Sequence, residues 1–266
     1  MSDEDEPIRV LRMEDADRVR VMVLDRPRSL NAFNDDLYDA VRDGLLEAAG
    51  CDEIAVVVLT GEGRAFTAGQ DLAEMARPRR HDDGEPHGFQ SFMDAVQAFP
   101  KPLIAAVNGL GVGIGLTLLL HCDQVLVSED ARLQTPFVRL GVTAEAASSF
   151  LMPERMGWQH AANLLFTAGW LDADQAVESG LALRKCSPGS LLVETMELAR
   201  TIAAMPIPSL VATKQLLIGA RLDSVTSARA RENKVWATLA GGPANREAVA
   251  AFREKRQPDF VNLPGA

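Results

Sequence analysis

Two glycine-containing turns hold the backbone groups that are best placed for chemistry in this sequence. The first is Thr67–Gln70, with the sequence TAGQ, and the second is Gly113–Gly115, with the sequence GIG. Glycine lets the backbone take positive φ angles and approach a ligand closely. A helix that starts at such a turn also presents N–H groups without intrahelical acceptors. These turns could therefore bind a phosphate or, if they meet in space, hold one oxyanion between them.

The second turn lies in the uncharged stretch 103–120, which has three other interpretations. A membrane span is disfavoured because four glycines and Asn108 interrupt the stretch and charged residues flank it closely. A dinucleotide-binding fingerprint fails because its third glycine would fall on Ile114. A buried strand, turn and helix without any chemistry remains open.

Composition limits the class of protein. The chain has 266 residues, of which 47% are hydrophobic, so it can bury one large core. A net charge of -10 argues against a nucleic-acid surface. The polar segment 77–87 holds two histidines beside two aspartates, but their spacing matches no metal motif, so we expect a surface loop and no metal site. The remaining indications point to the cytoplasm: an acidic, polar N-terminus unlike a signal peptide, and three cysteines without a C-x-x-C pair, Cys51, Cys122 and Cys186.

The elements that must position the two turns follow an alternating pattern. Strands are expected at 8–13, 19–24, 54–60, 103–107, 124–127 and 181–184, with a hairpin turn at 14–17. Helices are expected at 35–49, 88–98, 116–120, from about 144, at 157–167 and at 172–179. Only helices follow, at about 188–204, 208–220, 224–240 and 244–255. This order predicts an α/β region over residues 1–205 and a helical C-terminal region over 206–266.

Four motifs in the expected order resemble the crotonase, or enoyl-CoA hydratase/isomerase, superfamily. They are Asp25–Asn34 (DRPRSLNAFN), Gly63–Leu72 (GRAFTAGQDL), Ala106–Asp123 and Phe252–Pro258 (FREKRQP). The resemblance implies an α/β fold, a crotonase-like spiral of ββα units with an all-helical C-terminal trimerisation region. It also implies a homotrimer or dimer of trimers that acts on an acyl-CoA, with no nucleic acid or membrane as partner. No cofactor is implied, because coenzyme A is part of the substrate.

The same resemblance assigns binding roles. The N–H groups of Gln70 and Ile114 would form the oxyanion hole beside Gly113. Lys255 and Phe252, from a neighbouring subunit, would lie near the CoA phosphate and adenine; from the residues alone, a solvated surface charge is as good an account of Arg28 and Lys255. The adenine and pantetheine would lie along Arg28, Ser29, Leu30, Ala65, Ala68, Asp71 and Leu72.

The departures from the family pattern concern catalysis. Hydratases of the family use two glutamates to bind and activate water, but the corresponding positions here are Thr117 and Phe137. One carboxylate remains, Glu145, in a segment that resembles the monofunctional Δ3,Δ2-enoyl-CoA isomerases, where a single glutamate is the base. Its structural alternative is a carboxylate in the first turn of a helix with Thr143 as N-cap.

The resemblance thus implies a proton shuttle. Glu145 would take the α-proton of a 3-enoyl-CoA and return a proton at the γ-carbon, while the oxyanion hole holds the enolate. Two alternatives stay open: a hydratase or other family reaction with a different water-activating set, and a CoA-binding protein that has lost catalysis. A serine peptidase on the same fold is disfavoured, because no Ser/His/Asp set stands at the turns and His121 and His160 fit structural roles better.

Overall fold

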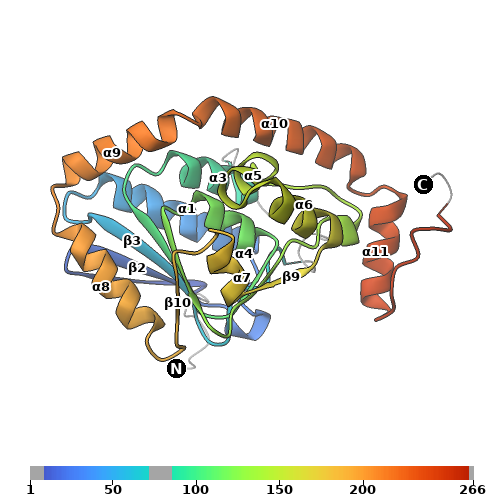
Figure 1. Cartoon of the computed structure of the whole chain (residues 1–266), viewed down its shortest axis with the longest axis horizontal. Coiled ribbons are helices and arrows are strands. Elements are labelled where there is room, and N and C mark those ends of the chain that lie inside the picture. The colour runs from blue at the N-terminus through green and yellow to red at the C-terminus, as the bar shows by residue number, and fades with distance from the viewer. Residues whose placement is uncertain (1–8, 72–85, 264–266) are drawn as a thin grey trace, which may run out of the picture.

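The computed structural model describes residues 9–71 and 86–263 of the chain (Figure 1). Its larger sheet has six strands in the order β1-β2-β3-β5-β7-β10. Only β1 and β2 are antiparallel to each other; the other neighbours are parallel. The strands are β1 (Leu11–Ala16), β2 (Val19–Leu24), β3 (Val56–Gly61), β5 (Leu103–Val107), β7 (Gln124–Ser128) and β10 (Arg184–Cys186).

Both faces of this sheet are covered, as the continuous apolar runs at 54–60 and 103–107 predict. Along β3, Val57 and Leu59 belong to the core that faces α1 (Asp35–Gly50) and α3 (Gly88–Ala98). The alternate residues Val56 and Val58 belong to a second core with α8 (Leu191–Ala203). The strands are therefore buried on both sides, with a different helix layer on each.

A second sheet of four short strands lies beside the first, in the order β4-β6-β8-β9. It contains β4 (Ala65–Thr67), β6 (Leu110–Val112), β8 (Arg132–Gln134) and β9 (Trp170–Asp172). In this sheet β4 and β6 are parallel neighbours, so the ends of β4 and β6, where the two glycine turns begin, lie at the same edge. The spiral of strand and helix units and the helix-rich C-terminal part confirm the predicted fold class.

The remaining helices bound the site or complete the shell. Short helical segments are η1 (Pro27–Ser29), α4 (Ile114–Thr117), η2 (Leu118–His121) and η3 (Val138–Leu140), and longer ones are α5 (Ser148–Met156), α6 (Trp158–Thr167) and α7 (Ala173–Glu178). After β10, α9 (Ile207–Gly219) and α10 (Leu222–Leu239) arch over the core, and α11 (Pro243–Arg253) projects at one side (Figure 1).

Three predicted boundaries are wrong. The first hairpin turns at Asp17 and Arg18 instead of 14–17, because both take positive φ (53° and 62°) and a two-residue turn lets the ladder run to Ala16. The last strand begins at Arg184 instead of 181, since Leu181 is buried in the connection after α7.

The third error concerns the helix expected from about residue 144. It begins at Ser148, because Ala146 and Ala147 have φ angles of 58° and 59° that a right-handed helix cannot contain.

The stretch 103–120 is not one apolar helix. It forms β5, β6, α4 and the start of η2. Across the described ranges, no single helix is long and apolar enough to cross a membrane. Taken as one segment, α8 and α9 would have the required length and apolar composition, but the chain bends by 103° between them.

Candidate active site

The structure brings the two glycine turns into contact. A side chain on Gly69, whose φ is +90°, would place its Cβ 2.7 Å from the carbonyl oxygen of Val112. A side chain on Gly115 would place its Cβ 2.8 Å from Cγ2 and 2.9 Å from the carbonyl oxygen of Thr67. The two loops therefore approach as closely as backbone permits, which is the role that sequence analysis expected of these glycines.

Two backbone N–H groups at this contact are unoccupied. Gly113 has a φ of 57° and a ψ of -116° and donates its own N–H to Gln134, at 2.9 Å from the carbonyl oxygen. Ile114 is the first residue of α4, so its N–H has no intrahelical acceptor. Neither Ile114 nor Gln70 donates its backbone N–H to any acceptor in the described part of the chain. Both groups are free to bind a ligand oxygen.

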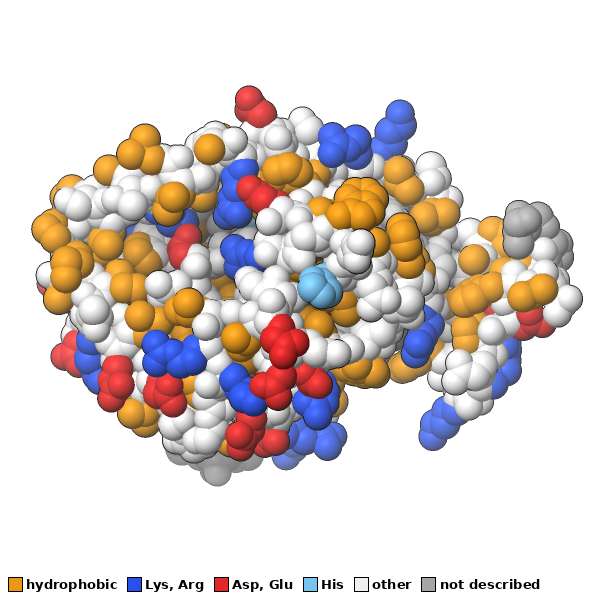
Figure 2. All heavy atoms as spheres, viewed as in Figure 1, with side chains coloured by type: hydrophobic (Ala, Val, Ile, Leu, Met, Phe, Trp, Pro, Cys, Tyr) orange, Lys and Arg blue, Asp and Glu red, His pale blue; other side chains and the backbone are white. Residues whose placement is uncertain are grey.

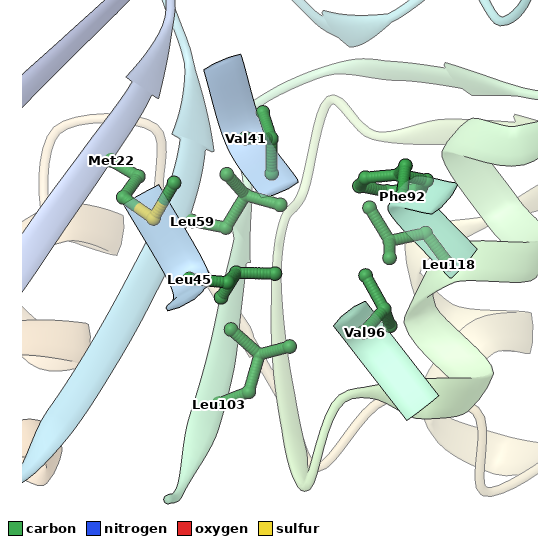
Figure 3. A pocket seen from close by; sticks show the side chains of 8 residues that line it. All are labelled: Met22, Val41, Leu45, Leu59, Phe92, Val96, Leu103 and Leu118. Atoms are coloured by element: carbon green, nitrogen blue, oxygen red, sulfur yellow. The ribbon is translucent and has the colours of Figure 1, made fainter. Parts of the chain in front are cut away.

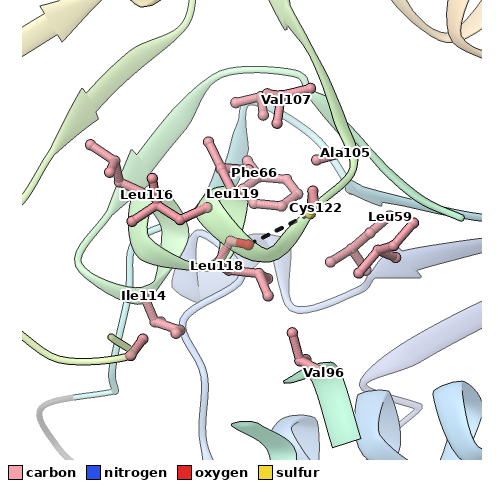
Figure 4. Close-up of a cluster of buried hydrophobic side chains, with 14 of the residues drawn as sticks. Leu59, Phe66, Val96, Ala105, Val107, Ile114, Leu116, Leu118, Leu119 and Cys122 are labelled. Atoms are coloured by element: carbon pink, nitrogen blue, oxygen red, sulfur yellow. Dashed lines mark hydrogen bonds between the residues drawn. The ribbon is translucent and has the colours of Figure 1, made fainter. Parts of the chain in front are cut away.

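The short helix is anchored from behind. Figure 4 shows Leu116, Leu118 and Leu119 of α4 and η2 among the buried apolar side chains. The Cys122 thiol donates to the carbonyl oxygen of Leu118 at 3.6 Å, and burial raises its pKa to about 12. Cys122 is thus an inert core residue, as expected.

The backbone around Gln70 is fixed by α1 and the segment before it. Phe33 donates its N–H to Gly69 and accepts one from Asp71, at 2.7 and 2.8 Å, on either side of Gln70. The Gln70 side chain accepts a hydrogen bond from the Tyr38 hydroxyl at 2.8 Å. Tyr38 is buried, and sequence analysis missed it; it is the only tyrosine in the chain, which gave no positional signal.

Glu145 lies in the connection between η3 and α5, not in a helix. Its side chain is half-buried and has no hydrogen-bond or ion-pair partner in the described part of the chain. Burial, and then the charge of Glu232, raise the pKa of Glu145 to about 8. After burial, the charge of Glu145 is the next cause that raises the pKa of Tyr38, whose hydroxyl binds the Gln70 side chain.

The alternative role for Glu145, a first-turn carboxylate with Thr143 as N-cap, is therefore wrong. The N-cap of α5 is Ala147, and the carboxylate that accepts its first N–H groups belongs to Glu232 on α10.

The two positions where hydratases carry glutamates hold no ionisable group. Thr117 is fully buried, and its hydroxyl donates to the carbonyl oxygen of Gly113 at 3.3 Å. Phe137 is buried just before η3. Neither side chain can itself deprotonate a water molecule, because neither carries a carboxylate.

The segments expected to hold CoA also meet. Arg28 and Ser29 are exposed on η1, and the N–H of Ala68 donates to the carbonyl oxygen of Leu30 at 2.8 Å. Ala65 is buried in β4. Leu72 lies outside the described residues.

Two of the structural contacts there were not predicted. Asp71 pairs with Arg26 at 3.0 Å, so its charge supports the loop. The fully buried Asn31 accepts the Arg26 N–H and donates to the carbonyl oxygens of Glu62 and Ala65. Asn31 thus links the loop after β2 to β4.

Phe252 and Lys255 are not joined to these residues within the described part of the chain. Phe252 lies near the end of α11 with 64% of its surface exposed, and Lys255 follows on an exposed turn. The start of α11 is attached to η3 through the Asn245 side chain, which donates to the carbonyl oxygen of Leu140 at 2.8 Å. Figure 2 shows lysine and arginine side chains at the free end of this projecting segment.

Two gaps elsewhere in the molecule are structural. Figure 3 shows one between α1, α3 and the large sheet; it is too narrow for a water molecule. The other, between α3, η2, α5 and the start of α10, includes His121 and Lys214 and has room for about one water. Neither is lined by a residue assigned to the acyl-CoA site. The residues that line the first are Met22, Val41, Leu45, Leu59, Phe92, Val96, Leu103 and Leu118.

His121 and His160 take the structural roles expected of them. His121 Nε2 lies 2.7 Å from the carbonyl oxygen of Ala146, and burial lowers the pKa of His121 to about 4, so the ring is neutral and donates. His160 Nδ1 lies 3.1 Å from the carbonyl oxygen of Met156. Residues 9–71 and 86–263 contain no cluster of three or more potential metal ligands. Most of segment 77–87 lies outside these ranges.

Comparison with known proteins gives the family. The model of the enoyl-CoA hydratase/isomerase family matches residues 14–262. A 2,3-dehydroadipyl-CoA hydratase of Escherichia coli is 34% identical over 247 residues, covering 91% of this chain and 95% of that protein. A 1,2-epoxyphenylacetyl-CoA isomerase of Escherichia coli is 32% identical over 253 residues, with coverages of 91% and 95%.

Solved structures agree. An enoyl-CoA hydratase/isomerase from Pseudoalteromonas atlantica superposes with a TM-score of 0.89 at 35% identity and covers 95% of this chain and 100% of that one. The fold, the contact between the two glycine turns and the matches to known proteins agree with one another. The chain belongs to the enoyl-CoA hydratase/isomerase family of the crotonase superfamily.

Proposed function

We propose that this enzyme isomerises 3-enoyl-CoA to 2-enoyl-CoA by a single-glutamate proton shuttle. The observation that carries the proposal is that one carboxylate is present near the two turns while the two carboxylates of the hydratases are replaced by other residues. Glu145 is a half-buried carboxylate without a partner in the described residues, whereas Thr117 and Phe137 occupy the positions of the hydratase glutamates. Moving a double bond needs only one group that acts first as base and then as acid.

The mechanism assigns each backbone and side-chain group a task. The thioester oxygen accepts hydrogen bonds from the N–H groups of Gln70 and Ile114, which stabilise the enolate as it forms. Ionised Glu145 removes a proton from the α-carbon, and the electrons move into the thioester carbonyl. Protonated Glu145 then delivers a proton to the γ-carbon, and the double bond comes to lie between the α- and β-carbons. A raised pKa makes Glu145 a strong base once it is ionised.

Coenzyme A would lie along Arg28–Leu30 and Ala65–Leu72, and no separate cofactor is needed. Phe252 and Lys255 would reach the adenine and phosphate of a CoA bound to a neighbouring subunit, because both are exposed and α11, which carries Phe252 and precedes Lys255, projects at one side of the core (Figure 1). This requires a homotrimer or a dimer of trimers. A stable monomer in light scattering at micromolar concentration would contradict the assignment of Phe252 and Lys255. A cytoplasmic location remains a prediction.

The main alternative is hydration. It draws support from relatives whose names are hydratases, including the 2,3-dehydroadipyl-CoA hydratase of Escherichia coli. A non-catalytic CoA-binding protein is the second alternative.

One assay separates these functions. Wild type and Glu145→Gln are each offered 3-enoyl-CoA and 2-enoyl-CoA, and the products are identified by mass spectrometry. We expect wild type to isomerise the first and scarcely hydrate the second, and Glu145→Gln to lose at least about 10³-fold in isomerisation, since the proposed mechanism uses no other base. Thr117→Ala is the matched control and should keep most of the rate, because its hydroxyl bonds only within α4.

Rapid hydration of 2-enoyl-CoA, or an active Glu145→Gln, would contradict the proposal. Tight binding of both esters without turnover would establish the non-catalytic alternative.

A further inference from the structure

The turn that carries Glu145 is strained. Ala146 and Ala147, which follow it directly, both adopt the left-handed conformation, with φ angles of 58° and 59°. This conformation is unfavourable for a non-glycine residue, and it persists only where the surroundings fix it. Two such residues in succession therefore need strong external support.

That support comes from two distant elements. Glu232 on α10 is only 5% exposed, and its two carboxylate oxygens accept the N–H groups of Ala147 and Ser149 at 2.7 and 2.8 Å. On the other side, His121 of η2 donates to the carbonyl oxygen of Ala146 at 2.7 Å. Three hydrogen bonds thus hold the backbone immediately after Glu145.

Helix α10 is itself held in place on either side of Glu232. Arg229, one turn earlier, donates to Asp94 and Gln97 on α3, at 2.8 and 2.9 Å. Asn233, the next residue, exchanges hydrogen bonds with Gln90 of the same helix. Glu232 therefore meets the start of α5 from a docked position.

The charge of Glu232 also matters for Glu145. The first N–H groups of a helix form a positive end that would favour an ionised carboxylate nearby. Here Glu232 occupies those groups and replaces their attraction with repulsion; after burial, it is the cause that raises the pKa of Glu145. Tyr38 on α1 and His121 on η2 are neutral near pH 7, because burial raises the pKa of the first and lowers that of the second. The charged groups nearby are Asp35, which acts on Tyr38, and Arg155, Arg221 and Arg229, which act on His121.

We propose that Glu232 is a positioning residue for Glu145: it holds the Ala146–Ala147 turn through both carboxylate oxygens and faces Glu145 with a second negative charge. The inference rests on the proposed role of Glu145 as the base. It assigns the C-terminal helical region a part in the chemistry of its own subunit, since α10 fixes the geometry and the protonation of the base.

The test follows the protonation of Glu145 directly. Carboxyl-¹³C NMR of glutamate-labelled protein, with Glu145→Gln to identify the signal, gives the Glu145 titration midpoint without any turnover. We expect a midpoint near pH 8 in wild type and a lower pKa in Glu232→Gln, which removes the charge and can accept only one of the two N–H groups. An unchanged midpoint in folded Glu232→Gln overturns the proposal.

Kinetics provide the second readout. Glu145 must be ionised to act as base, so kcat/KM for 3-enoyl-CoA should rise through the Glu145 pKa, and this limb should move to lower pH in Glu232→Gln. We expect kcat to fall about tenfold or more with little change in KM, because a misplaced base slows chemistry rather than binding. If Glu232→Gln does not fold, Glu232→Asp keeps the charge but has a shorter reach. It should keep the high midpoint and lose kcat, and an unchanged kcat would overturn the positioning role.

Asn233→Ala is the matched control, because it removes a side-chain contact of α10 with α3 next to Glu232 and leaves the start of α5 untouched. It should leave both readouts unchanged; an equal shift would assign the effect to helix docking and overturn the proposal. Failure of the proposed function is distinguishable: it would appear as no isomerisation by wild type, while the NMR titration still tests Glu232.

Discussion

Two helices, α4 and α5, begin after a residue with positive φ, but their first N–H groups meet different partners. Each helix follows a residue with positive φ, Gly113 or Ala147, and neither has a side-chain cap on its N-cap residue. At α4 the N–H of Ile114 has no acceptor in the described part of the chain. At α5 the N–H of the first residue, Ser148, donates to the carbonyl oxygen of Glu145, and the N–H groups of Ala147 and Ser149 on either side of it donate to the carboxylate of Glu232.

The difference shows how one structural feature can serve two chemical purposes. An unfilled helix start attracts negative charge, which suits the oxyanion of an enolate. Helix N–H groups that already bind one carboxylate no longer stabilise the charge of a second carboxylate nearby. Such a site suits a base whose pKa must be high. The N–H at the start of α4 would thus bind the negatively charged oxygen of the substrate. The N–H groups at the start of α5 that bind Glu232 would not stabilise the charge of Glu145.

Of three changes that test this comparison, displacing the start of α4 should have the largest effect. In Gly115→Val the new side chain meets Thr67 at under 3 Å, so α4 must move away from the Gln70 loop. We expect kcat/KM to fall by about 10²–10³, or roughly 3–4 kcal/mol of transition-state stabilisation, the usual loss of one oxyanion donor. Gly219→Ala, where a side chain meets open space, is the control. A folded Gly115→Val with normal kinetics would remove α4 from the oxyanion hole.

Replacing Glu145 by the neutral Gln should have an intermediate effect, and this effect concerns the free energy of unfolding. The pKa of Glu145 is about 8 in the folded protein against an ordinary value of 4.5, so the folded state binds more protons between these pH values. The stability that protonated Glu145 contributes is complete below pH 4.5 and is lost as pH rises through 8.

Urea unfolding should therefore show Glu145→Gln to be more stable than wild type by about 1–2 kcal/mol at pH 9. The difference should vanish near pH 4. A gap that is constant with pH would mean that packing, and not charge, is responsible.

Relaxing the strained turn should have the smallest effect. Glycine adopts the φ of 59° at position 147 without strain, so Ala147→Gly should change stability by less than about 1 kcal/mol, with lower strain offset by a more flexible unfolded chain. We expect kcat to change by no more than about threefold while Glu232 still holds the turn. Thermal unfolding and steady-state kinetics check this, and a loss as large as that of Gly115→Val would mean that the turn needs its alanine for another reason.

The sequence predicted the elements whose signal is local. The buried runs that became β3 and β5 and the apolar stripe of α1 are periodic or continuous, and Gly113 and Gly115 marked the turn into α4. The contact between the two glycine turns followed from the resemblance, and packing at Gly69 and Gly115 then supplied its physical basis.

What could not be predicted depends on contacts between distant parts of the chain. Alanine has no preference for positive φ, so nothing in the sequence placed the turn at Ala146 and Ala147 or moved the start of α5 to Ser148. The cap by Glu232 joins residues more than 80 positions apart. The three-residue strands of the second sheet, such as β9, are too short to show a period.

The central claim, that Glu145 serves both carbons of the allylic system, is tested most directly by a crystal structure with a bound, non-reacting 3-enoyl-CoA analogue. The account predicts a Glu145 carboxylate oxygen roughly 3–3.5 Å from both the α- and γ-carbons, with the thioester oxygen between the N–H groups of Gln70 and Ile114. An analogue bound with its γ-carbon facing Phe137 and Thr117, away from Glu145, would contradict it.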